Sequence, residues 1–321
     1  MSEISISCDG RDLPAMFLDK VASGEAGGAA RIWIANHLFL RDPATLATFA
    51  LERSARMDVA LMAVNPFTLH PVQAAMMAAT LDELFPGRVT LCLGVGAPAD
   101  LKAVGLDAAK PLKAMREAFE AIRALLAGEA VTVAGEVFSI RDRRLATGAR
   151  RVPLALAASG PQMLELAGAI ADRVLISAGS SVEFVERTLE RVQRGAKGRA
   201  VKTSGLVYAS VDNDPRAAHD RLRRTLAILL RGPHHKDNLA VAGSVLDQER
   251  VNQAVLAEDW PRAESLITDE IVMRHAASGE PAQVRDRFSA YRAAGLDEIV
   301  VAGARDGDQI AKILKSVKGG T

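Results

Sequence analysis

Short apolar runs alternate with longer amphipathic segments along this chain. In "DPATLATFALERSA", "HPVQAAMMAATLDELF" and "PLKAMREAFEAIRALLAG", apolar residues recur at spacings of three and four, which predicts helices. The apolar runs between such segments predict strands. Alternation of strand and helix favours a parallel sheet covered by helices, and eight such units in 321 residues favour an α/β fold of the (β/α)8 TIM-barrel type. The eight predicted strands are Ile4–Cys8, Arg31–Asn36, Asp58–Val64, Val89–Gly94, Pro153–Ser159, Asp172–Ser177, Ser204–Val211 and Glu298–Ala302.

Two segments interrupt this alternation. "GEAVTVAGEVFSI" alternates with period two around Ala134-Gly135 and predicts a hairpin insertion near residues 128–150. Residues 214–279 carry helical patterns and predict an α-helical insertion before the last strand. No low-complexity linker or repeat separates the parts, so we expect one domain over residues 1–321.

Composition narrows the function classes. Forty basic and thirty-nine acidic residues nearly cancel, so no whole-molecule field attracts nucleic acid or an anionic membrane, and a small-molecule substrate is favoured. Two cysteines are too few for a disulfide framework. The N-terminus lacks the pattern of a secretory signal, and no apolar run approaches the roughly 20 residues of a membrane span. We therefore expect a cytoplasmic protein.

Polar or glycine-rich residues follow five of the predicted strands. Active sites of TIM barrels lie at the carboxyl ends of the strands, so these residues are expected on one rim. They are Asn36-His37, Asn65-Pro66, Gly94-Val95-Gly96, Ser159-Gly160-Pro161 and Ser177-Ala178-Gly179.

His37 is the candidate proton donor or acceptor on this rim, with a purely structural histidine as the alternative. His70 precedes a proline that begins a helix, where a turn role and a substrate contact are equally open. His234-His235 has no carboxylate or thiol at ligand spacing, so a solvated loop is expected there and no metal site.

Two glycine-containing turns are candidate ligand-binding sites. "LCLGVGAPADL" lacks the third glycine of a dinucleotide fingerprint; its glycines allow either a close approach to a flat ligand or a tight turn. Pro161 suits the first position of a helix and leaves Gly160 at the N-cap, where free backbone amides and the Ser159 hydroxyl can hold a phosphate; plain capping is the alternative. Ser180 and Glu183 have the spacing of a capping box.

Four stretches together resemble the bacterial luciferase-like superfamily of flavin- and deazaflavin-dependent oxidoreductases, and most of all its coenzyme F420-dependent, methylenetetrahydromethanopterin reductase-like branch. They span most of the chain in the family's order: "WIANHLFLRDP", "NPFTLHPVQAAMMAATLDELFPGRVTLCLGVG", "AASGPQMLELAGAIADRVLIS" and "ASGEPAQVRDRFSAYRAAGLDEIVVAG".

The resemblance implies a (β/α)8 barrel whose cofactor lies at the C-terminal mouth, with its phosphate near the end of the fifth strand. It implies a role beside the cofactor ring for His37, and a non-prolyl cis peptide bond around Met62-Ala63-Val64. Asn36 stands where the family usually has an acid, and "APA" stands where an acid often follows the glycines of strand four. Asn36 is expected to orient His37 by a hydrogen bond. The residues expected to bind the cofactor are Met62, Ala63, Asn65, Val95, Gly96, Ala158, Ser159 and Gly160.

Three functional hypotheses follow. The first is an oxidoreductase that transfers a hydride between F420 and a small organic substrate, with His37 moving the proton. The second is an FMN-dependent monooxygenase of the same superfamily. The third is a cofactor-binding barrel without turnover, suggested by the two missing acids. The resemblance also implies a homodimer.

Overall fold

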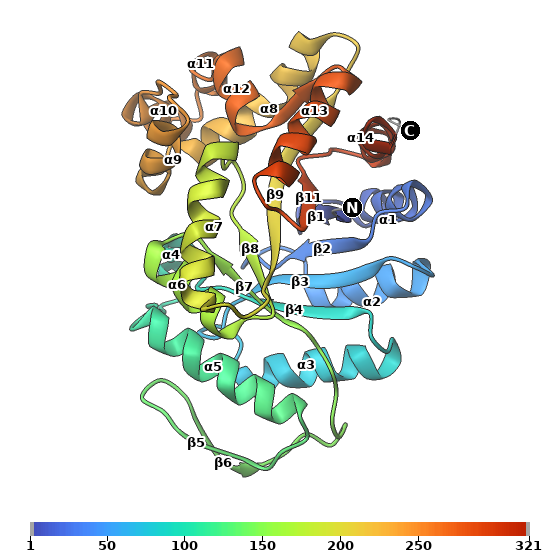
Figure 1. The fold of residues 1–321 in the computed structure, drawn as a ribbon, viewed down its shortest axis with the longest axis vertical. Coiled ribbons are helices and arrows are strands. Elements are labelled where there is room, and N and C mark those ends of the chain that lie inside the picture. Colours follow the sequence, from blue (N-terminus) through green and yellow to red (C-terminus); the bar gives the residue numbers. More distant parts are fainter. Residues whose placement is uncertain (1–2, 319–321) are drawn as a thin grey trace.

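Eight parallel strands close into a barrel in the computed structural model, which describes residues 3–318 (Figure 1). Each strand pairs in parallel with its neighbours, and β8 pairs with β9 to complete the ring. The predicted TIM barrel is therefore confirmed, with strand bounds within two residues of those expected from the sequence. The strands of the barrel are β1 (Glu3–Cys8), β2 (Arg31–Ala35), β3 (Asp58–Val64), β4 (Val89–Leu93), β7 (Leu154–Ala158), β8 (Arg173–Ile176), β9 (Lys202–Val211) and β11 (Glu298–Ala302).

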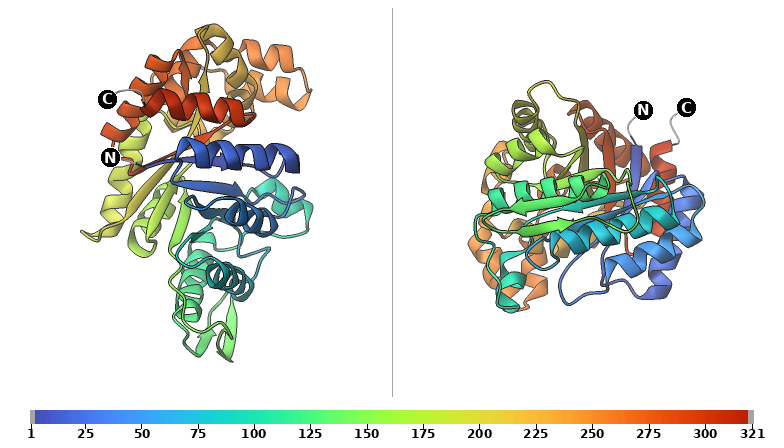
Figure 2. Two further views of the ribbon diagram at one scale, coloured as in Figure 1. Left: turned by 90° about the vertical axis from the view of Figure 1, so that its right-hand side faces the viewer. Right: turned by 90° about the horizontal axis from the view of Figure 1, so that it is seen from below.

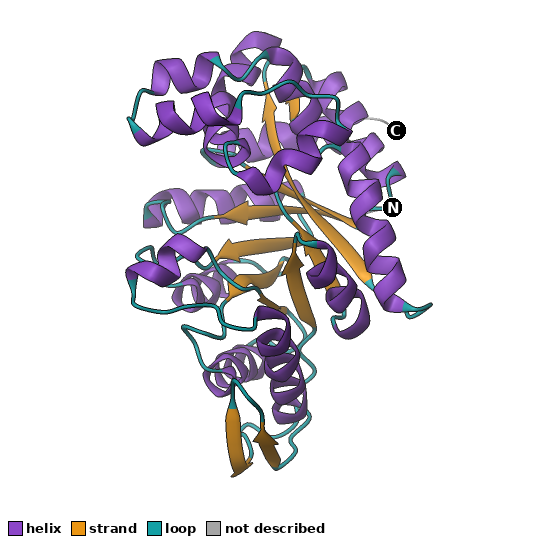
Figure 3. Ribbon diagram, turned by 90° about the vertical axis from the view of Figure 1, so that its left-hand side faces the viewer, coloured by secondary structure: helices purple, strands orange, loops and turns teal. Residues whose placement is uncertain are grey.

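Helices connect the strands and surround the barrel, as Figure 3 shows. Most of them have proline in the first turn, where its fixed φ favours the helix and its missing N–H costs nothing. These helices are α1 (Pro14–Gly27), α2 (Pro43–Arg53), α3 (Pro71–Leu84), α4 (Pro98–Ala103), α5 (Pro111–Leu126), α6 (Pro161–Ile170), α7 (Val182–Ala196), α13 (Pro281–Ala293) and α14 (Gly307–Lys318).

A buried carboxylate lies at the amino-terminal end of the barrel. Glu298, fully buried at the start of β11, accepts hydrogen bonds from Arg31 at 2.9 Å and Arg173 at 2.8 Å, and from the hydroxyls of Ser5 and Ser204 at 2.5 Å. Burial alone would raise the pKa of Glu298, but the two guanidinium groups hold that pKa below its ordinary value. This cluster closes the end of the barrel opposite the mouth.

A buried core that includes Trp33 fills the barrel interior. Trp33 lies at the centre of the barrel core and donates its indole N–H to Glu298 at 3.1 Å. Nearer the carboxyl ends of the strands, Met62, Ala63, Ala157 and Leu206 pack against this core. All four line the cavity at the mouth.

The predicted hairpin insertion is confirmed as strands β5 (Val131–Ala134) and β6 (Ser139–Arg143), which pair antiparallel. Glu117, a buried residue of α5, accepts the backbone N–H groups of residues 136–138 at 3.0–3.1 Å. The turn is thereby fixed to the barrel helix beneath it.

The helical insertion is also present and has a small apolar core of its own. It lies at the opposite end of the longest axis from the hairpin, as Figure 1 and the left view of Figure 2 show. Its last element is a short strand that lengthens the sheet beside β9. The insertion comprises α8 (Pro215–Leu230), a 3-10 turn (Pro233–His235), α9 (Lys236–Val241), α10 (Gln248–Leu256), α11 (Trp260–Ser265), α12 (Asp269–His275) and β10 (Ala277–Gly279).

Three buried side chains, two from this insertion and one from α13, bond the backbone of the loop that follows β8. Asn238 donates to the carbonyl of Gly179 at 2.7 Å and accepts the N–H of Ser181 at 2.9 Å. His275 bonds the same Gly179 carbonyl through Nδ1 at 2.9 Å, and the Tyr291 hydroxyl of α13 donates to the Ser180 carbonyl at 2.8 Å. The loop therefore has its backbone groups satisfied from above the barrel.

Among residues 3–318, no helix combines the length and apolarity that a membrane crossing requires.

Candidate active site

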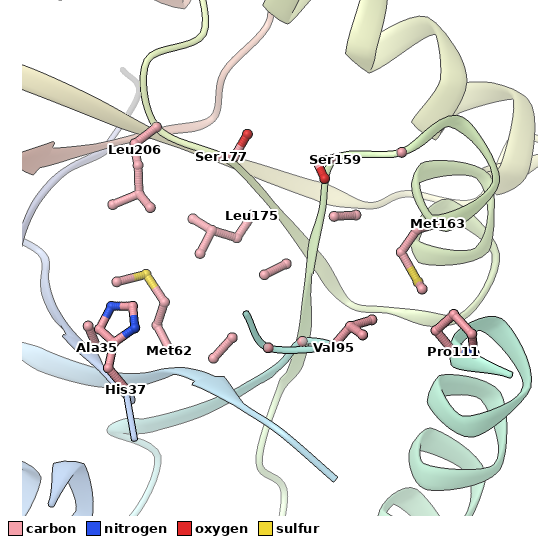
Figure 4. A pocket seen from close by; sticks show the side chains of 17 residues that line it. Ala35, His37, Met62, Val95, Pro111, Ser159, Met163, Leu175, Ser177 and Leu206 are labelled. Atoms are coloured by element: carbon pink, nitrogen blue, oxygen red, sulfur yellow. The ribbon is translucent and has the colours of Figure 1, made fainter. Parts of the chain in front are cut away.

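A cavity of about 510 Å³ opens at the carboxyl ends of the strands. Figure 4 shows His37 and Met62 on one side of it, and Ser159 and Met163 on the other. Of the residues predicted to form the site, His37, Met62, Ala63, Val95, Gly96, Ala158, Ser159 and Gly160 line this cavity. Asn36 and Asn65 line a smaller cavity of about 220 Å³ that shares His37, Ala63 and Gly96 with it.

His37 lies where three cavities meet. β2 ends at Ala35, so the exposed His37 projects from the barrel rim, and it lines the two cavities above and a third of about 590 Å³. Within residues 3–318 its ring forms no hydrogen bond, which leaves both ring nitrogens available to a ligand. A histidine in this position can donate or accept a proton.

Asn36 does not orient His37, contrary to the expectation from the sequence. Its side-chain N–H₂ donates to the carbonyl of Ala63 at 3.4 Å, and its backbone N–H donates to the carbonyl of Met62. Asn36 thus supports the end of β3. A carboxylate at this position would lose the donor and face a carbonyl oxygen.

The end of β3 contains the non-prolyl cis peptide bond that the family resemblance implies, between Met62 and Ala63. The backbone of β4 passes close by, since a Cβ added to Gly94 would lie 2.8 Å from the Cβ of Ala63. Only glycine fits at this approach.

The loop after β4 is held by Asn65. This buried residue donates from Nδ2 to the carbonyl of Val95 at 2.8 Å and accepts the N–H of Phe67 at 2.8 Å. Gly96 has a φ of +83°, and a Cβ there would lie 2.2 Å from Nδ2 of Asn65. The two glycines of this turn are therefore explained by close packing and backbone conformation, which places the backbone of residues 94–96 on the cavity wall.

Helix α6 begins at the far side of the cavity with its first turn uncapped. Gly160 is its N-cap (φ −79°, ψ 150°) and Pro161 its first residue, as predicted, and no side chain caps the turn. The N–H groups of Gln162 and Met163 precede the first acceptor within the helix. No atom lies within 4 Å of a Cβ placed on Gly160, and within residues 3–318 the exposed Ser159 hydroxyl forms no hydrogen bond.

The start of α7 differs from α6 and from the sequence-based prediction. Ser181, not Ser180, is its N-cap and accepts the N–H of Phe184 at 3.2 Å, so Glu183 stands one position too early for a capping box. The Ser180 hydroxyl donates to the carbonyl of Ser177 at 2.9 Å. The predicted capping box is therefore wrong by one residue.

Among residues 3–318, no charged side chain lines this cavity. Its polar groups are the His37 ring, the Ser159 and Ser177 hydroxyls and backbone groups, while the rest is mainly alanine, glycine and larger apolar residues. The larger apolar ones were not predicted from the sequence: Pro111, Met163, Leu175 and Leu206. Inward-facing positions on β8 and β9 could have identified the two leucines, but the two helix positions depend on packing between distant elements.

The other histidines do not belong to this site. His70 caps α3, accepting the N–H of Val72 at 3.3 Å, and packs edge-on against Phe138. The expected solvated loop at residues 234–235 is only half right, because His234 is exposed whereas His235 is buried. Burial lowers the pKa of both His235 and His275 to about 4. Residues 3–318 contain no group of three metal-ligating side chains.

Comparisons with known proteins agree with this fold. The model of the family described as luciferase-like monooxygenase matches residues 12–298. The 5,10-methylenetetrahydromethanopterin reductase of Archaeoglobus fulgidus is 29% identical over 306 residues, 92% of each chain. The F420-dependent glucose-6-phosphate dehydrogenase of Beutenbergia cavernae is 30% identical over 75% of this chain and 70% of its own. The solved structure of the F420-dependent tetrahydromethanopterin reductase of Methanopyrus kandleri superposes with a TM-score of 0.90 at 24% identity, covering 98% of each chain.

Proposed function

The chain belongs to the luciferase-like monooxygenase family, and from this premise we propose that it is an F420-dependent oxidoreductase acting on a small organic substrate. The names of the relatives support the cofactor, since both the dehydrogenase and the solved reductase are F420-dependent. The observation that carries the proposal is the uncharged cavity, with an unpaired histidine on one side and an uncapped helix start on the other.

The residues around the cavity fit a phosphorylated deazaflavin. The amides of Gln162 and Met163 and the Ser159 hydroxyl would hold the phosphate, because a helix N-terminus without side-chain bulk favours an anion. Met62, Ala63, Leu175 and the backbone of residues 94–96 would contact the ring. When bound, F420 supplies a carbon that donates or accepts a hydride.

The chain's own part in the reaction is to place and protonate the substrate. A ring nitrogen of His37 donates a proton to the substrate oxygen or nitrogen during reduction, and accepts it during oxidation. Met62 and Leu206, which line both this cavity and the one of about 590 Å³, reduce the access of water to the reacting atoms. Asn36 keeps the end of β3 in place without contributing charge.

Titration with two cofactors tests the proposal. The purified protein is titrated with F420 and with FMN, and the dissociation constant of each is measured. We expect F420 to bind at least about tenfold more tightly, a difference of about 1.4 kcal/mol. Tighter binding of FMN would favour the monooxygenase instead. Tight binding of F420 without reduction of any carbonyl or imine in a substrate panel would favour the barrel without turnover.

The compartment and assembly belong to the same proposal. Cys8 and Cys92 are buried free thiols, which supports the reducing cytoplasm. The homodimer rests on the family resemblance and stays a prediction that light scattering can test.

A further inference from the structure

The third cavity that His37 lines is the largest of the three. From its lining we infer that it takes the substrate and that the substrate carries an anionic substituent, a carboxylate or a phosphate. This inference rests on the proposed function, because it assigns the uncharged cavity to the deazaflavin. We call this cavity, of about 590 Å³, the charged cavity, and the one of about 510 Å³ the uncharged cavity.

The charged cavity adjoins the uncharged one directly. Five residues line both: Ala35, His37, Met62, Ala178 and Leu206. The uncharged cavity is otherwise bounded by β3, β7, β8, the loop after β4 and helices α5 and α6. The charged cavity is otherwise bounded by β1, β9, β11 and helices α1 and α8. A molecule in the charged cavity therefore shares a boundary with any ring in the other, and His37 stands at that boundary.

Two ion pairs on the charged cavity's wall are already balanced. The buried ammonium of Lys20 bonds both carboxylate oxygens of Asp12, at 2.7 and 2.8 Å. Asp9 accepts the backbone N–H of Arg11 at 2.7 Å and lies 3.4 Å from its guanidinium. Neither pair leaves a net charge for a ligand.

Arg305 is the charged residue on this wall that belongs to neither ion pair. It follows β11 on the cavity wall and forms no ion pair or hydrogen bond within residues 3–318. Two acids beside the start of α14 bond its backbone instead: Asp19 accepts the N–H of Gly307 at 2.8 Å, and Asp306 accepts that of Gln309 at 2.9 Å. An unpaired guanidinium with a planar set of donors is suited to a carboxylate or a phosphate.

Two free hydroxyls complete the recognition surface. Tyr208 on β9 and Thr225 on α8 line the charged cavity, and neither hydroxyl forms a hydrogen bond within residues 3–318. Burial, and next the negative charge of Asp9, raise the pKa of Tyr208, so its hydroxyl stays protonated and can donate. The wall between these groups is apolar, with Cys8, Ala302 and Ala304. A short oxygenated molecule with one anionic end matches this lining.

Matched probes test the inference in the F420-loaded protein. Pyruvate is compared with methyl pyruvate, and glycerol 3-phosphate with glycerol, by the change in deazaflavin fluorescence at low ionic strength. We expect the anionic member of at least one pair to bind about tenfold or more tightly than its neutral partner, and 1 M salt to reduce the difference. Preference for pyruvate indicates a carboxylate, and preference for glycerol 3-phosphate a phosphate.

Variants assign the preference to a residue. Arg305→Gln should remove it, Arg305→Lys should keep part of it, and both should leave F420 affinity unchanged. Arg53→Gln, an exposed arginine at the end of α2, is the control and should keep the full preference. Equal binding within both pairs, or a preference that survives in Arg305→Gln, overturns the inference.

The same probes applied to the protein without cofactor separate this inference from the proposed function. Melting temperatures are measured with each probe for the parent, Arg305→Gln and Gly160→Val. An anion held at the α6 turn is lost in Gly160→Val, whereas one held in the charged cavity is lost in Arg305→Gln. If F420 fails to bind but the Arg305 effect is present, the proposed function falls, and with it the assignment of the anion as the substrate, while the anion site itself stands. If F420 binds and no preference exists, only this inference falls.

Discussion

Replacing Gly160 with valine separates a phosphate site from an ordinary helix start. Gly160 has φ −79° and ψ 150°, a conformation that valine adopts readily, and the added Cβ meets no atom within 4 Å. Pro161 still begins the helix. The side chain enters the space through which a phosphate would reach the amides of Gln162 and Met163.

Gly160→Val is expected to raise the free energy of unfolding slightly and to lower the affinity for F420. Removing a glycine at a compatible site stabilises a protein by about 0.4–1 kcal/mol, because the unfolded chain loses freedom. A hydrogen bond to a charged group contributes roughly 1.5–3 kcal/mol, so losing two from the phosphate costs about 3–6 kcal/mol, or about 10²–10⁴-fold in affinity. The unliganded variant should therefore melt at or slightly above the parent's temperature while F420 binding is largely lost.

The assay measures F420 affinity by titration and the melting temperature of the unliganded protein in parallel. Leu13→Val is a matched control, since Leu13 is also an N-cap without a side-chain bond (φ −62°, ψ 150°) followed by proline, and it lies outside the cavity. It should change neither quantity appreciably. If Gly160→Val binds F420 as tightly as the parent, or if its affinity falls only together with its melting temperature, the phosphate site is not at this turn.

Three further results are expected. His37→Ala should lower turnover by about 10²–10⁴-fold at saturating F420 with little change in F420 affinity, and equal rates would remove His37 from proton transfer. Asn65→Ala removes the side-chain partners of the Val95 carbonyl and the Phe67 N–H. Urea unfolding should therefore show a free energy of unfolding lower by about 1–3 kcal/mol, and F420 should bind more weakly. Unchanged F420 binding would mean that the Val95–Gly96 backbone does not touch the cofactor. Burial lowers the pKa of His275 from 6.5 to about 4, so the unfolded chain binds the proton at a higher pH than the folded chain does. The stabilisation is therefore full above about pH 6.5 and falls toward pH 4 by up to about 1.4 kcal/mol per pH unit. His275→Gln should make this fall shallower, and an identical slope in the variant would contradict the assignment.

The sequence predicted the barrel well because its signal is local. Alternation of buried strands with amphipathic helices recurs eight times, and proline at helix starts marks many boundaries. The turn at Gly160 was predictable for the same reason, since its glycine and proline are adjacent in the chain.

Directions of side chains were less predictable, because they depend on partners distant in sequence. Asn36 neighbours His37 in the chain but bonds the carbonyl of Ala63 on the next strand. Nothing near His235 in the sequence predicts its burial, and its Nδ1 lies 3.4 Å from the buried Nδ2 of Asn238. The charged cavity combines residues from both ends of the chain, such as Arg11 and Arg305, and no local pattern joins them.

Three side chains support the mouth of the barrel by bonding backbone groups of the loop after β8. Asn238, His275 and Tyr291 bond the carbonyls of Gly179 and Ser180 and the N–H of Ser181, directly after Ser177 and Ala178 on the cavity wall. Because these bonds use the backbone, they do not depend on which side chains the loop presents to the cavity. At the opposite end, the buried Glu298 cluster ties together β1, β2, β8, β9 and β11. The barrel is thus fixed below and above the site, and the residues between can be small enough to leave space for a cofactor and a substrate on either side of His37.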